Sequence, residues 1–277
     1  MKKYLALSTA LSIALGPIAA IAQECTNDTW NHVMETGVLT VGVKADYMPW
    51  GFRNTDGDII GMEPDMAQLV ADAMGVDLEL VAVVSSNRMQ FLEQGQIDLM
   101  IATMTDRADR REIVGIVGPN YYTSGTNVLA PEALDFTAWE DLRGQPVCAV
   151  QGAFYNQIVE ERYGVEIVAF AGTAEGRQAL RDRRCVAWVY DDSSIGSTLA
   201  TGEWEGFEMP LPSEDDSPWG LAVPLAEEDC VFGRFMSGMQ YAWHQDGTLM
   251  ALEEEWGIQP TSYLATMNER MADHLSE

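Results

Sequence analysis

Residues 64–84 read PDMAQLVADAMGVDLELVAVV, and this stretch decides the fold. Its first half has apolar side chains at helical spacing, with Pro64 in the first turn and Gly75 as a stop signal. Residues 76–84 then show the alternation that is typical of a strand. A helix that leads through a glycine into a strand predicts one step of an α/β fold.

The neighbouring segments extend this pattern on both sides. Residues 38–43 form a short β-rich run before the helix, and a turn-rich stretch around residues 54–57 separates the two. After the strand, residues 87–94 predict a short helix that Gly95 closes, and residues 97–101 predict a buried strand. The order is β-α-β-α-β, which predicts a parallel sheet flanked by helices.

A second, similar series follows Pro131, and with 277 residues the chain exceeds one ordinary core. We therefore expect an α/β protein with two tightly coupled lobes. The series comprises strands at residues 146–150, 166–170 and 185–190, helices at residues 154–163 and 174–183, and final helices at residues 232–244 and 248–255.

The N-terminus predicts a secretory signal peptide. Lys2 and Lys3 form a basic start, residues 5–21 are mostly apolar, and Ala20-Ile21-Ala22 has the small-x-small form that signal peptidase cuts. The apolar run is shorter than a comfortable membrane span, and no later stretch approaches eighteen apolar residues. We expect cleavage after Ala22 and a soluble mature protein in the periplasm.

The formal net charge is −27, and Lys44 is the only lysine beyond the signal segment. A general nucleic-acid partner is excluded, because phosphate contact needs a basic surface. With 47% hydrophobic residues, the chain nevertheless has the composition of a folded protein.

The cysteines predict disulfides rather than a metal site. None of the four forms a C-x-x-C pair, and the three histidines are scattered. An oxidising compartment favours disulfides, but four cysteines allow three pairings. Catalytic and cofactor motifs such as G-x-S-x-G, G-x-G-x-x-G, H-E-x-x-H and a Walker loop are missing, so we expect no cofactor and no catalytic residue. The cysteines are Cys25, Cys148, Cys185 and Cys230.

Thr103, Thr105 and Arg110 follow the predicted buried strand at residues 97–101. Parallel sheets bind ligands at this carboxyl edge. Two hydroxyls, the amides of a starting helix and a guanidinium are able to converge there on one carboxylate. A capping threonine followed by an exposed arginine explains the same spacing.

Two further groups of residues have both a structural and a binding interpretation. Tyr47 and Trp50 lie in a loop after the strand at residues 38–43, where aromatic residues either form a core cluster or present a wall to a ligand. Asp191 follows the strand at residues 185–190 and either pairs with an ammonium group or caps a turn. Lys44 and Arg88 are cations in a chain with few of them, and Arg88, at the start of a short predicted helix, either binds a ligand or is simply exposed to solvent.

Taken in order, these segments resemble the periplasmic solute-binding proteins of polar amino-acid ABC transporters. The resemblance covers nearly the whole mature chain and implies a two-lobed type II periplasmic binding protein fold. Lobe one would comprise residues 23–127 and 221–277, and lobe two residues 128–220, with two crossings between them. The motifs that carry it are Gly37-Val-Leu-Thr-Val-Gly42, Pro49-Trp50, Gly61-Met-Glu-Pro-Asp65, Leu92-Glu-Gln-Gly95, Thr103-x-Thr105…Arg110, Asp141-Leu-Arg-Gly144, Gln151-Gly152, Asp191, Trp219-Gly-Leu-Ala-Val223 and Asp246-Gly-Thr248.

The resemblance also implies a role for each candidate residue. Thr105, with its amide, and Arg110 would hold the α-carboxylate of an amino acid. Thr103 and Asp191 would hold the α-ammonium group, and Tyr47 would cover the ligand.

Lys44 falls where relatives read the ligand side chain, and Arg88 corresponds to a cation found in acidic-amino-acid binders. Two cations facing one extra carboxylate favour glutamate or aspartate. One departure points elsewhere: Ala153-Phe154 follows Gln151-Gly152 where relatives usually carry hydroxyl residues. Phe154 adds an apolar wall, which suits a larger or modified amino acid.

The same resemblance implies a monomer without catalytic activity that docks on a membrane permease. Its lobes imply disulfides within each lobe, Cys148 with Cys185 and Cys25 with Cys230. The alternative function is a lyase on the same scaffold, similar to cyclohexadienyl dehydratase. Such an enzyme needs a proton donor aimed at a leaving hydroxyl.

Overall fold

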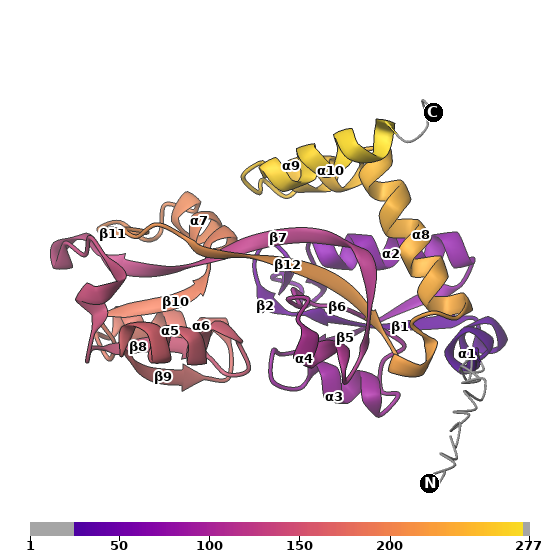
Figure 1. Cartoon of the computed structure of the whole chain (residues 1–277), viewed down its shortest axis with the longest axis horizontal. Coiled ribbons are helices and arrows are strands. Elements are labelled where there is room, and N and C mark those ends of the chain that lie inside the picture. The colour runs from indigo at the N-terminus through magenta and orange to yellow at the C-terminus, as the bar shows by residue number, and fades with distance from the viewer. Residues whose placement is uncertain (1–24, 274–277) are drawn as a thin grey trace, which may run out of the picture.

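In a computed structural model, which describes residues 25–273, the chain forms two lobes joined by two long strands (Figure 1). The predicted two-lobed α/β architecture is confirmed. The predicted signal peptide and its cleavage after Ala22 lie outside the described residues. None of the helices described here is long and apolar enough to cross a membrane.

The first lobe takes its elements from both ends of the chain (Figure 1). From the N-terminal half come α1 (Asp28–Thr36), β1 (Val38–Lys44), β2 (Asp46–Tyr47), β3 (Gly51–Arg53), β4 (Ile59–Ile60), α2 (Met62–Met74), β5 (Asp77–Val83), α3 (Arg88–Glu93), β6 (Leu99–Ile101) and α4 (Ala108–Arg111). From the C-terminal end come the 3-10 turn η3 (Leu225–Glu227), α8 (Val231–Gln245), α9 (Thr248–Glu255) and α10 (Ser262–Asp273).

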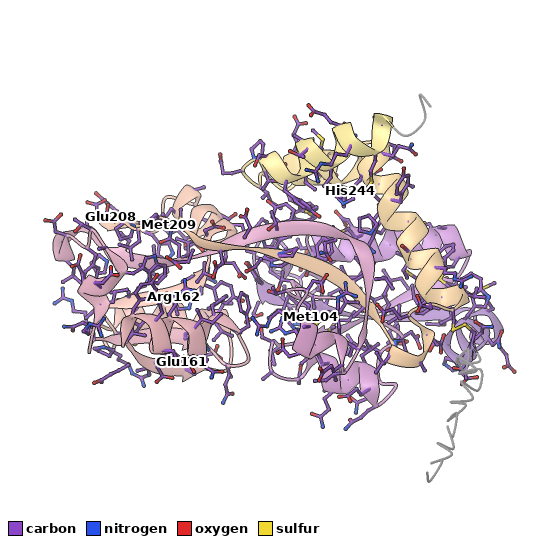
Figure 2. The ribbon with its side chains drawn as sticks, viewed as in Figure 1. Met104, Glu161, Arg162, Glu208, Met209 and His244 are labelled. Atoms are coloured by element: carbon purple, nitrogen blue, oxygen red, sulfur yellow. A yellow bond between two sulfur atoms is a disulfide. The ribbon has the colours of Figure 1, made fainter. Side chains whose placement is uncertain are left out.

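The second lobe is one continuous stretch of chain between the two long strands. Figure 2 shows Glu161, Arg162, Glu208 and Met209 in this lobe, while Met104 and His244 lie in the first. Its elements are η1 (Glu132–Leu134), η2 (Trp139–Leu142), β8 (Pro146–Val150), α5 (Tyr155–Tyr163), β9 (Glu166–Phe170), α6 (Thr173–Arg181), β10 (Ala187–Asp191), α7 (Asp192–Ala200) and β11 (Phe207–Glu208).

The strands that join the lobes are β7 (Gly115–Pro131) and β12 (Glu214–Val223), which pair with each other in antiparallel fashion. They connect the strands of both lobes into one sheet of order β5-β1-β6-β12-β7-β10-β8-β9. Within each lobe the neighbouring strands run parallel: β5 and β6 flank β1, and β10 and β9 flank β8. The lobe boundaries expected near Asn127 and Gly220 fall inside the two joining strands.

Local sequence explains most of these elements. Two predicted strands, β8 and β9, have the predicted bounds, because each is a short apolar run closed by turn residues. The helix α2 ends at Gly75, which adopts the left-handed conformation (φ 71°) that stops a helix without a steric cost. Its buried face packs against β1 and β5 and closes one side of the first core.

Each lobe contains one disulfide. Cys25 is bonded to Cys230 in the first lobe, and Cys148 is bonded to Cys185 in the second, which is the pairing that the family resemblance implied. Because neither bond connects the two lobes, neither opposes their relative movement.

The disulfide of the second lobe is expected to be a large part of that lobe's stability. Its cysteines are 37 residues apart, and closing a loop of that length in the unfolded chain is worth roughly 3–4 kcal/mol. Replacing both Cys148 and Cys185 by alanine should therefore lower the free energy of unfolding by that order, measured by urea denaturation. A double variant within about 1 kcal/mol of the natural protein would contradict this.

Candidate functional site

Charged and aromatic residues from the two lobes meet where the lobes touch. The Tyr47 hydroxyl donates to Asp191 Oδ2 at 2.8 Å, and the backbone N–H of Thr173 donates to Asp46 Oδ2 at 2.9 Å. Arg110 Nη2 donates to the carbonyl of Gly152 at 3.4 Å. Each of these hydrogen bonds joins one lobe to the other, so the two lobes are in contact and the structure is a closed form.

The backbones of the two lobes also come close together at Gly152. Its backbone has φ 81°, and a Cβ atom there would lie 2.8 Å from backbone atoms of Ser85 and Ser86. No side chain fits in that space, so glycine permits both the local conformation and the contact.

Parallel strands deliver the candidate residues to one place. Lys44 is the last residue of β1 and Asp191 the last of β10, while Thr103 follows β6 by two positions. The carboxyl ends of parallel strands share one edge of a sheet, and that edge is where α/β folds place ligands. The two sheet edges face each other across the contact between the lobes.

Lys44 is buried, with 1% of its surface exposed. Its ammonium group donates to Ser85 Oγ at 2.7 Å. Burial, followed by the nearby charge of Arg88, lowers the pKa of Lys44 to about 8. The group is therefore mostly charged at neutral pH, and among residues 25–273 its hydrogen-bond partner is the neutral Ser85 hydroxyl.

Arg88, also buried, begins helix α3 and points toward the end of β6. Its Nη1 donates to the carbonyls of Thr103, at 3.0 Å, and Ala102. Its Nε is buried and has no hydrogen-bond partner within the described part of the chain. The structure thus places Arg88 beside Lys44 but uses one of its nitrogens to hold the backbone after β6.

The Arg110 side chain contacts the backbone of the residues that precede helix α4. Its Nη1 donates to the carbonyl of Thr105 at 3.1 Å, and both side chains are buried. Burial, followed by the charge of Arg88, lowers the pKa of Arg110 to about 9, so it remains a cation at neutral pH. A guanidinium held in this way presents a fixed donor fork.

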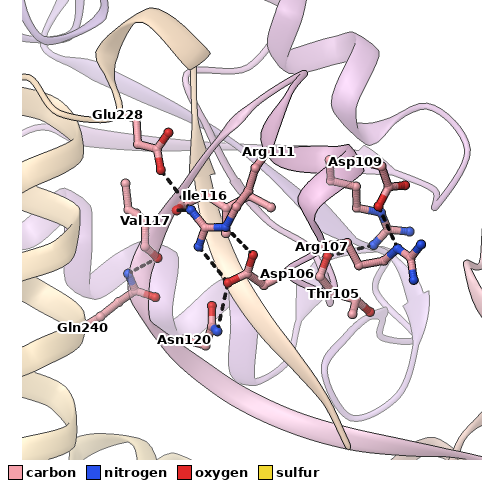
Figure 3. A network of polar contacts seen from close by, with 11 residues as sticks. Thr105, Asp106, Arg107, Asp109, Arg111, Ile116, Val117, Asn120, Glu228 and Gln240 are labelled. Atoms are coloured by element: carbon pink, nitrogen blue, oxygen red, sulfur yellow. Dashed lines mark hydrogen bonds and ion pairs between the residues drawn. The ribbon is translucent and has the colours of Figure 1, made fainter. Parts of the chain in front are cut away.

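Figure 3 shows the hydrogen bonds and ion pairs that hold Asp106 and Arg111, the residues on either side of the Arg107–Arg110 stretch. Arg111 forms two bonds with Asp106, at 2.6 and 2.7 Å, and a third with Glu228 at 3.0 Å. Asn120 of β7 donates to the same Asp106 carboxylate at 3.1 Å. The network ties the residues after Thr105 to a joining strand and so orients Arg110.

Asp191 is the buried acid of the second lobe. Burial raises its pKa to about 7, against the opposing effect of the hydrogen bond from Tyr47. The Tyr47 ring lies 5.0 Å from the ring of Tyr190, which belongs to the same strand as Asp191. Tyr47 therefore covers the carboxylate from the opposite lobe.

The two remaining aromatic candidates have different surroundings. The ring of Phe154 lies under two guanidinium groups, those of Arg107 at 5.0 Å and Arg110 at 5.9 Å. Trp50 is fully buried between Tyr122 and Trp219 of the joining strands, at 4.3 and 4.8 Å between ring centroids. Trp50 thus packs against the two joining strands, whereas Phe154 lies beside Arg107 and Arg110.

Sequence reasoning did not single out Glu63, the buried acid that the first lobe contributes beside Lys44 and Arg88. Its Oε1 accepts from the backbone N–H of Thr103 at 2.6 Å and from the Tyr121 hydroxyl. Burial raises its pKa to about 7, and these two hydrogen bonds oppose the shift. A signal was present: Glu63 lies three and four residues before Met66 and Ala67, which places an acid on the apolar face of a helix.

The structure therefore brings the predicted Lys44, Tyr47, Arg88, Thr103, Thr105, Arg110, Phe154 and Asp191 to the contact between the lobes. Three fully buried cations lie there with two fully buried carboxylates and with the half-buried Asp46. Over residues 25–273, no cluster of three histidine, cysteine or acidic side chains is arranged to hold a metal ion. Such a site suits a small molecule with both positive and negative ends.

Comparison with known proteins gives consistent matches. The family of bacterial extracellular solute-binding proteins, family 3, matches residues 39–259. An L-cystine-binding protein of Escherichia coli is 26% identical over 255 residues, which cover 91% of this chain and 94% of the relative. An ABC transporter glutamine-binding protein of Bacillus subtilis is 26% identical over 208 residues, 73% of this chain and 75% of the relative.

A solved structure extends the similarity. The crystal structure of an ancestral amino acid-binding protein, a precursor of cyclohexadienyl dehydratase, has a TM-score of 0.74 and 25% identity. The match covers 82% of this chain and 99% of the ancestral one.

Proposed function

Because the chain belongs to the bacterial extracellular solute-binding proteins of family 3, we propose that it captures glutamate or aspartate between its lobes for an ABC importer. The closed form delivers the ligand to a permease in the membrane. In this proposal the mature protein begins after Ala22 and acts as a periplasmic monomer. The lobes comprise residues 23–127 with 221–277, and residues 128–220.

The backbone part of the ligand is assigned to four residues. The amide of Thr105 and the guanidinium of Arg110 hold the α-carboxylate, since a planar donor fork matches a carboxylate. Thr103 and Asp191 hold the α-ammonium group. Tyr47 covers the ligand and Phe154 forms an apolar wall, which is consistent with their positions on opposite lobes.

The observation that favours an acidic ligand is the balance of positive and negative charge among the fully buried residues of the site. Lys44, Arg88 and Arg110 are three buried cations, and Glu63 and Asp191 are the two acids beside them. The two ends of an amino acid add no net charge, so one positive charge stays in excess among the fully buried groups, while the half-buried Asp46 also acts on Lys44. A carboxylate on the ligand side chain, placed near Lys44, offsets it.

Binding and closure are coupled in this proposal. The bonds from Tyr47 to Asp191 and from Arg110 to Gly152 exist only when the lobes touch. A ligand that contacts both lobes favours that state by its higher affinity for it. A micromolar dissociation constant needs only about −8 kcal/mol, which a few charge-assisted contacts supply after ordering costs.

The ligand class is tested by a thermal-shift screen over the common amino acids, with bound ligand first removed by dialysis. We expect larger shifts with glutamate or aspartate than with glutamine. In Lys44→Met, glutamate should bind roughly ten-fold or more weakly, because a charge-assisted hydrogen bond is worth about 1.5–3 kcal/mol. Glutamine should change by less than about three-fold.

Lys44→Arg is the matched control for that prediction. It keeps the positive charge at the same position and should keep the preference for the acid over the amide. Equal losses for glutamate and glutamine in Lys44→Met would contradict the charge-reading role. A screen in which cystine or another large amino acid gives the greatest shift would instead favour the alternative of a larger ligand, for which Phe154 provides the wall.

A lyase is the second candidate, and one observation favours it. The pKa of Asp191, raised to about 7 by burial, is suited to a group that gives up a proton near neutral pH. The assignment of Asp191 to an ammonium group opposes this role. Incubating the protein with prephenate or arogenate and monitoring aromatic product by absorbance separates the two: turnover would replace the binding-protein proposal.

A further inference from the structure

Thr103 has an unusual backbone conformation. Its φ is 47°, in the left-handed region that β-branched residues avoid. The residue is buried and lies two positions after β6, directly before the segment that carries Thr105 and Arg110. A conformation of this kind persists only where its surroundings hold it.

Two buried charged side chains hold the peptide groups of Thr103. Glu63 Oε1 accepts from the Thr103 N–H at 2.6 Å, and Arg88 Nη1 donates to the Thr103 carbonyl at 3.0 Å. Glu63 comes from the first turn of α2 and Arg88 from the first turn of α3. The Tyr121 hydroxyl donates to the same Glu63 oxygen and fixes it from β7. We call this arrangement the Thr103 clamp: Glu63, Arg88 and Tyr121.

One oxygen of the Glu63 carboxylate is not used by these hydrogen bonds. Its second oxygen, Oε2, is buried and has no hydrogen-bond partner among residues 25–273. Lys44 and Arg88 are both close enough for their charges to stabilise its ionised form. The negative charge of Glu63 therefore acts on the cations that face the ligand side chain, as well as on the clamp.

We propose that Glu63 is a positioning and specificity-determining residue, which holds the Thr103–Thr105 segment for carboxylate recognition and offsets the charge of Lys44 and Arg88. This inference rests on the proposed function, since it assumes an amino acid bound beside Lys44. It assigns Glu63 no contact with the ligand. By partly neutralising the cations, Glu63 limits how strongly the site prefers an anionic side chain over a neutral one.

The two parts of this role are separated by two variants. Glu63→Gln keeps an oxygen that accepts from the Thr103 N–H and the Tyr121 hydroxyl, but it removes the charge. Glu63→Met keeps the length of the side chain and removes both the acceptor and the charge. Glu79→Gln is the control, because Glu79 is an exposed acid of β5 in the same lobe.

The dissociation constants of glutamate and glutamine are measured for each protein by titration calorimetry. The measurement is made at pH 7.5, between the pKa of about 7 that burial gives Glu63 and the pKa of about 8 that burial gives Lys44, so that both groups are mostly charged. In Glu63→Gln, we expect the preference for glutamate over glutamine to rise roughly ten-fold, because one nearby negative charge is gone. In Glu63→Met, glutamine should bind roughly ten-fold or more weakly, because the Thr103 amide is left with only its 3.1 Å hydrogen bond to the Tyr121 hydroxyl. The preference for glutamate over glutamine should rise as in Glu63→Gln, because the same charge is gone. Glu79→Gln should match the natural protein within about two-fold.

Two results would overturn the inference. One is an unchanged preference in Glu63→Gln, which would leave Glu63 a purely structural residue. The other is unchanged affinity for both ligands in Glu63→Met, which would show that the clamp does not position the segment. If the natural protein binds another amino acid more tightly than glutamate, the proposed ligand class fails, and the loss in Glu63→Met is then measured with that amino acid.

Discussion

Replacing Arg110 by glutamine is expected to weaken amino-acid binding at least roughly 100-fold. Truncating one partner of a buried, hydrogen-bonded charge pair costs about 2–5 kcal/mol, which is about 30-fold to several thousand-fold in affinity. Arg110 contributes twice in the closed protein, since it is assigned to the ligand carboxylate and also donates to Gly152 of the opposite lobe. Glutamine keeps a polar group but neither the charge nor the fork.

Arg234→Gln is the control for this result. Arg234 is an exposed residue of α8 in the same lobe, so the variant has the same change in net charge. It should bind within about two-fold of the natural protein. Titration calorimetry gives both affinities, and circular dichroism checks that the fold is intact. An Arg110→Gln protein that binds within ten-fold of the natural one would remove Arg110 from the carboxylate site.

Replacing Asp191 by asparagine is expected to remove both tight binding and its dependence on pH. Asp191 must be ionised to hold an ammonium group, and burial raises its pKa to about 7 in the ligand-free protein. Affinity in the natural protein should therefore fall as pH is lowered through 7, by up to about ten-fold per unit below it. The variant should bind roughly 100-fold more weakly at pH 7.5 and show little change down to pH 5.

Other charged groups near Asp191 decide how this experiment is read. Asp192, Lys44 and Arg88 all act on the pKa of Asp191, and the Tyr47 hydroxyl donates to it. Glu63 also titrates near pH 7, and its protonation would strengthen the binding of an anionic side chain, opposite to the effect of Asp191. Glutamine, whose side chain is neutral, is therefore the better probe.

Asp182→Asn, which changes an exposed acid of the second lobe, is the control and should keep the natural pH profile. A pH dependence that survives in Asp191→Asn would assign the titration to another group.

The free energy of unfolding also depends on pH through Asp191. The folded protein holds the Asp191 proton up to a pKa of about 7, whereas the unfolded chain releases it near the ordinary value of 3.8. Asp191 therefore lowers the stability of the fold as pH rises from 3.8 to about 7.

The parts of the fold that the sequence predicts are those whose signals are local. The strands β8 and β9 are short apolar runs between turn residues, and α2 has both helical spacing and a terminal glycine. The joining strand β7 was missed because it contains Gly118-Pro119 and several polar residues, and its partners change from β12 to β10 along its length. Its stability comes from distant strands, which no local pattern reveals.

The candidate site likewise contains some residues whose position local sequence predicts and others whose position it does not. Lys44, Thr103 and Asp191 stand at or just after strand ends, so their position at a sheet edge follows from the pattern. Helix α7 directly after Asp191 was missed because its sequence, DSSIGSTLA, is rich in serine and glycine and has weak helix propensity. Glu63 was passed over because an acid at the start of a helix is usually explained by the helix dipole.

The first lobe contains both ends of the described chain, and this affects how the protein folds as the chain is made. Its sheet lacks β12 until residues 214–223 have been made, and Cys25 has no disulfide partner until Cys230 has been made. The second lobe is continuous, with a disulfide across 37 residues, so it is able to mature first. Until then one side of β6 is an open strand edge, which is exposed to wrong pairing before the chain is complete.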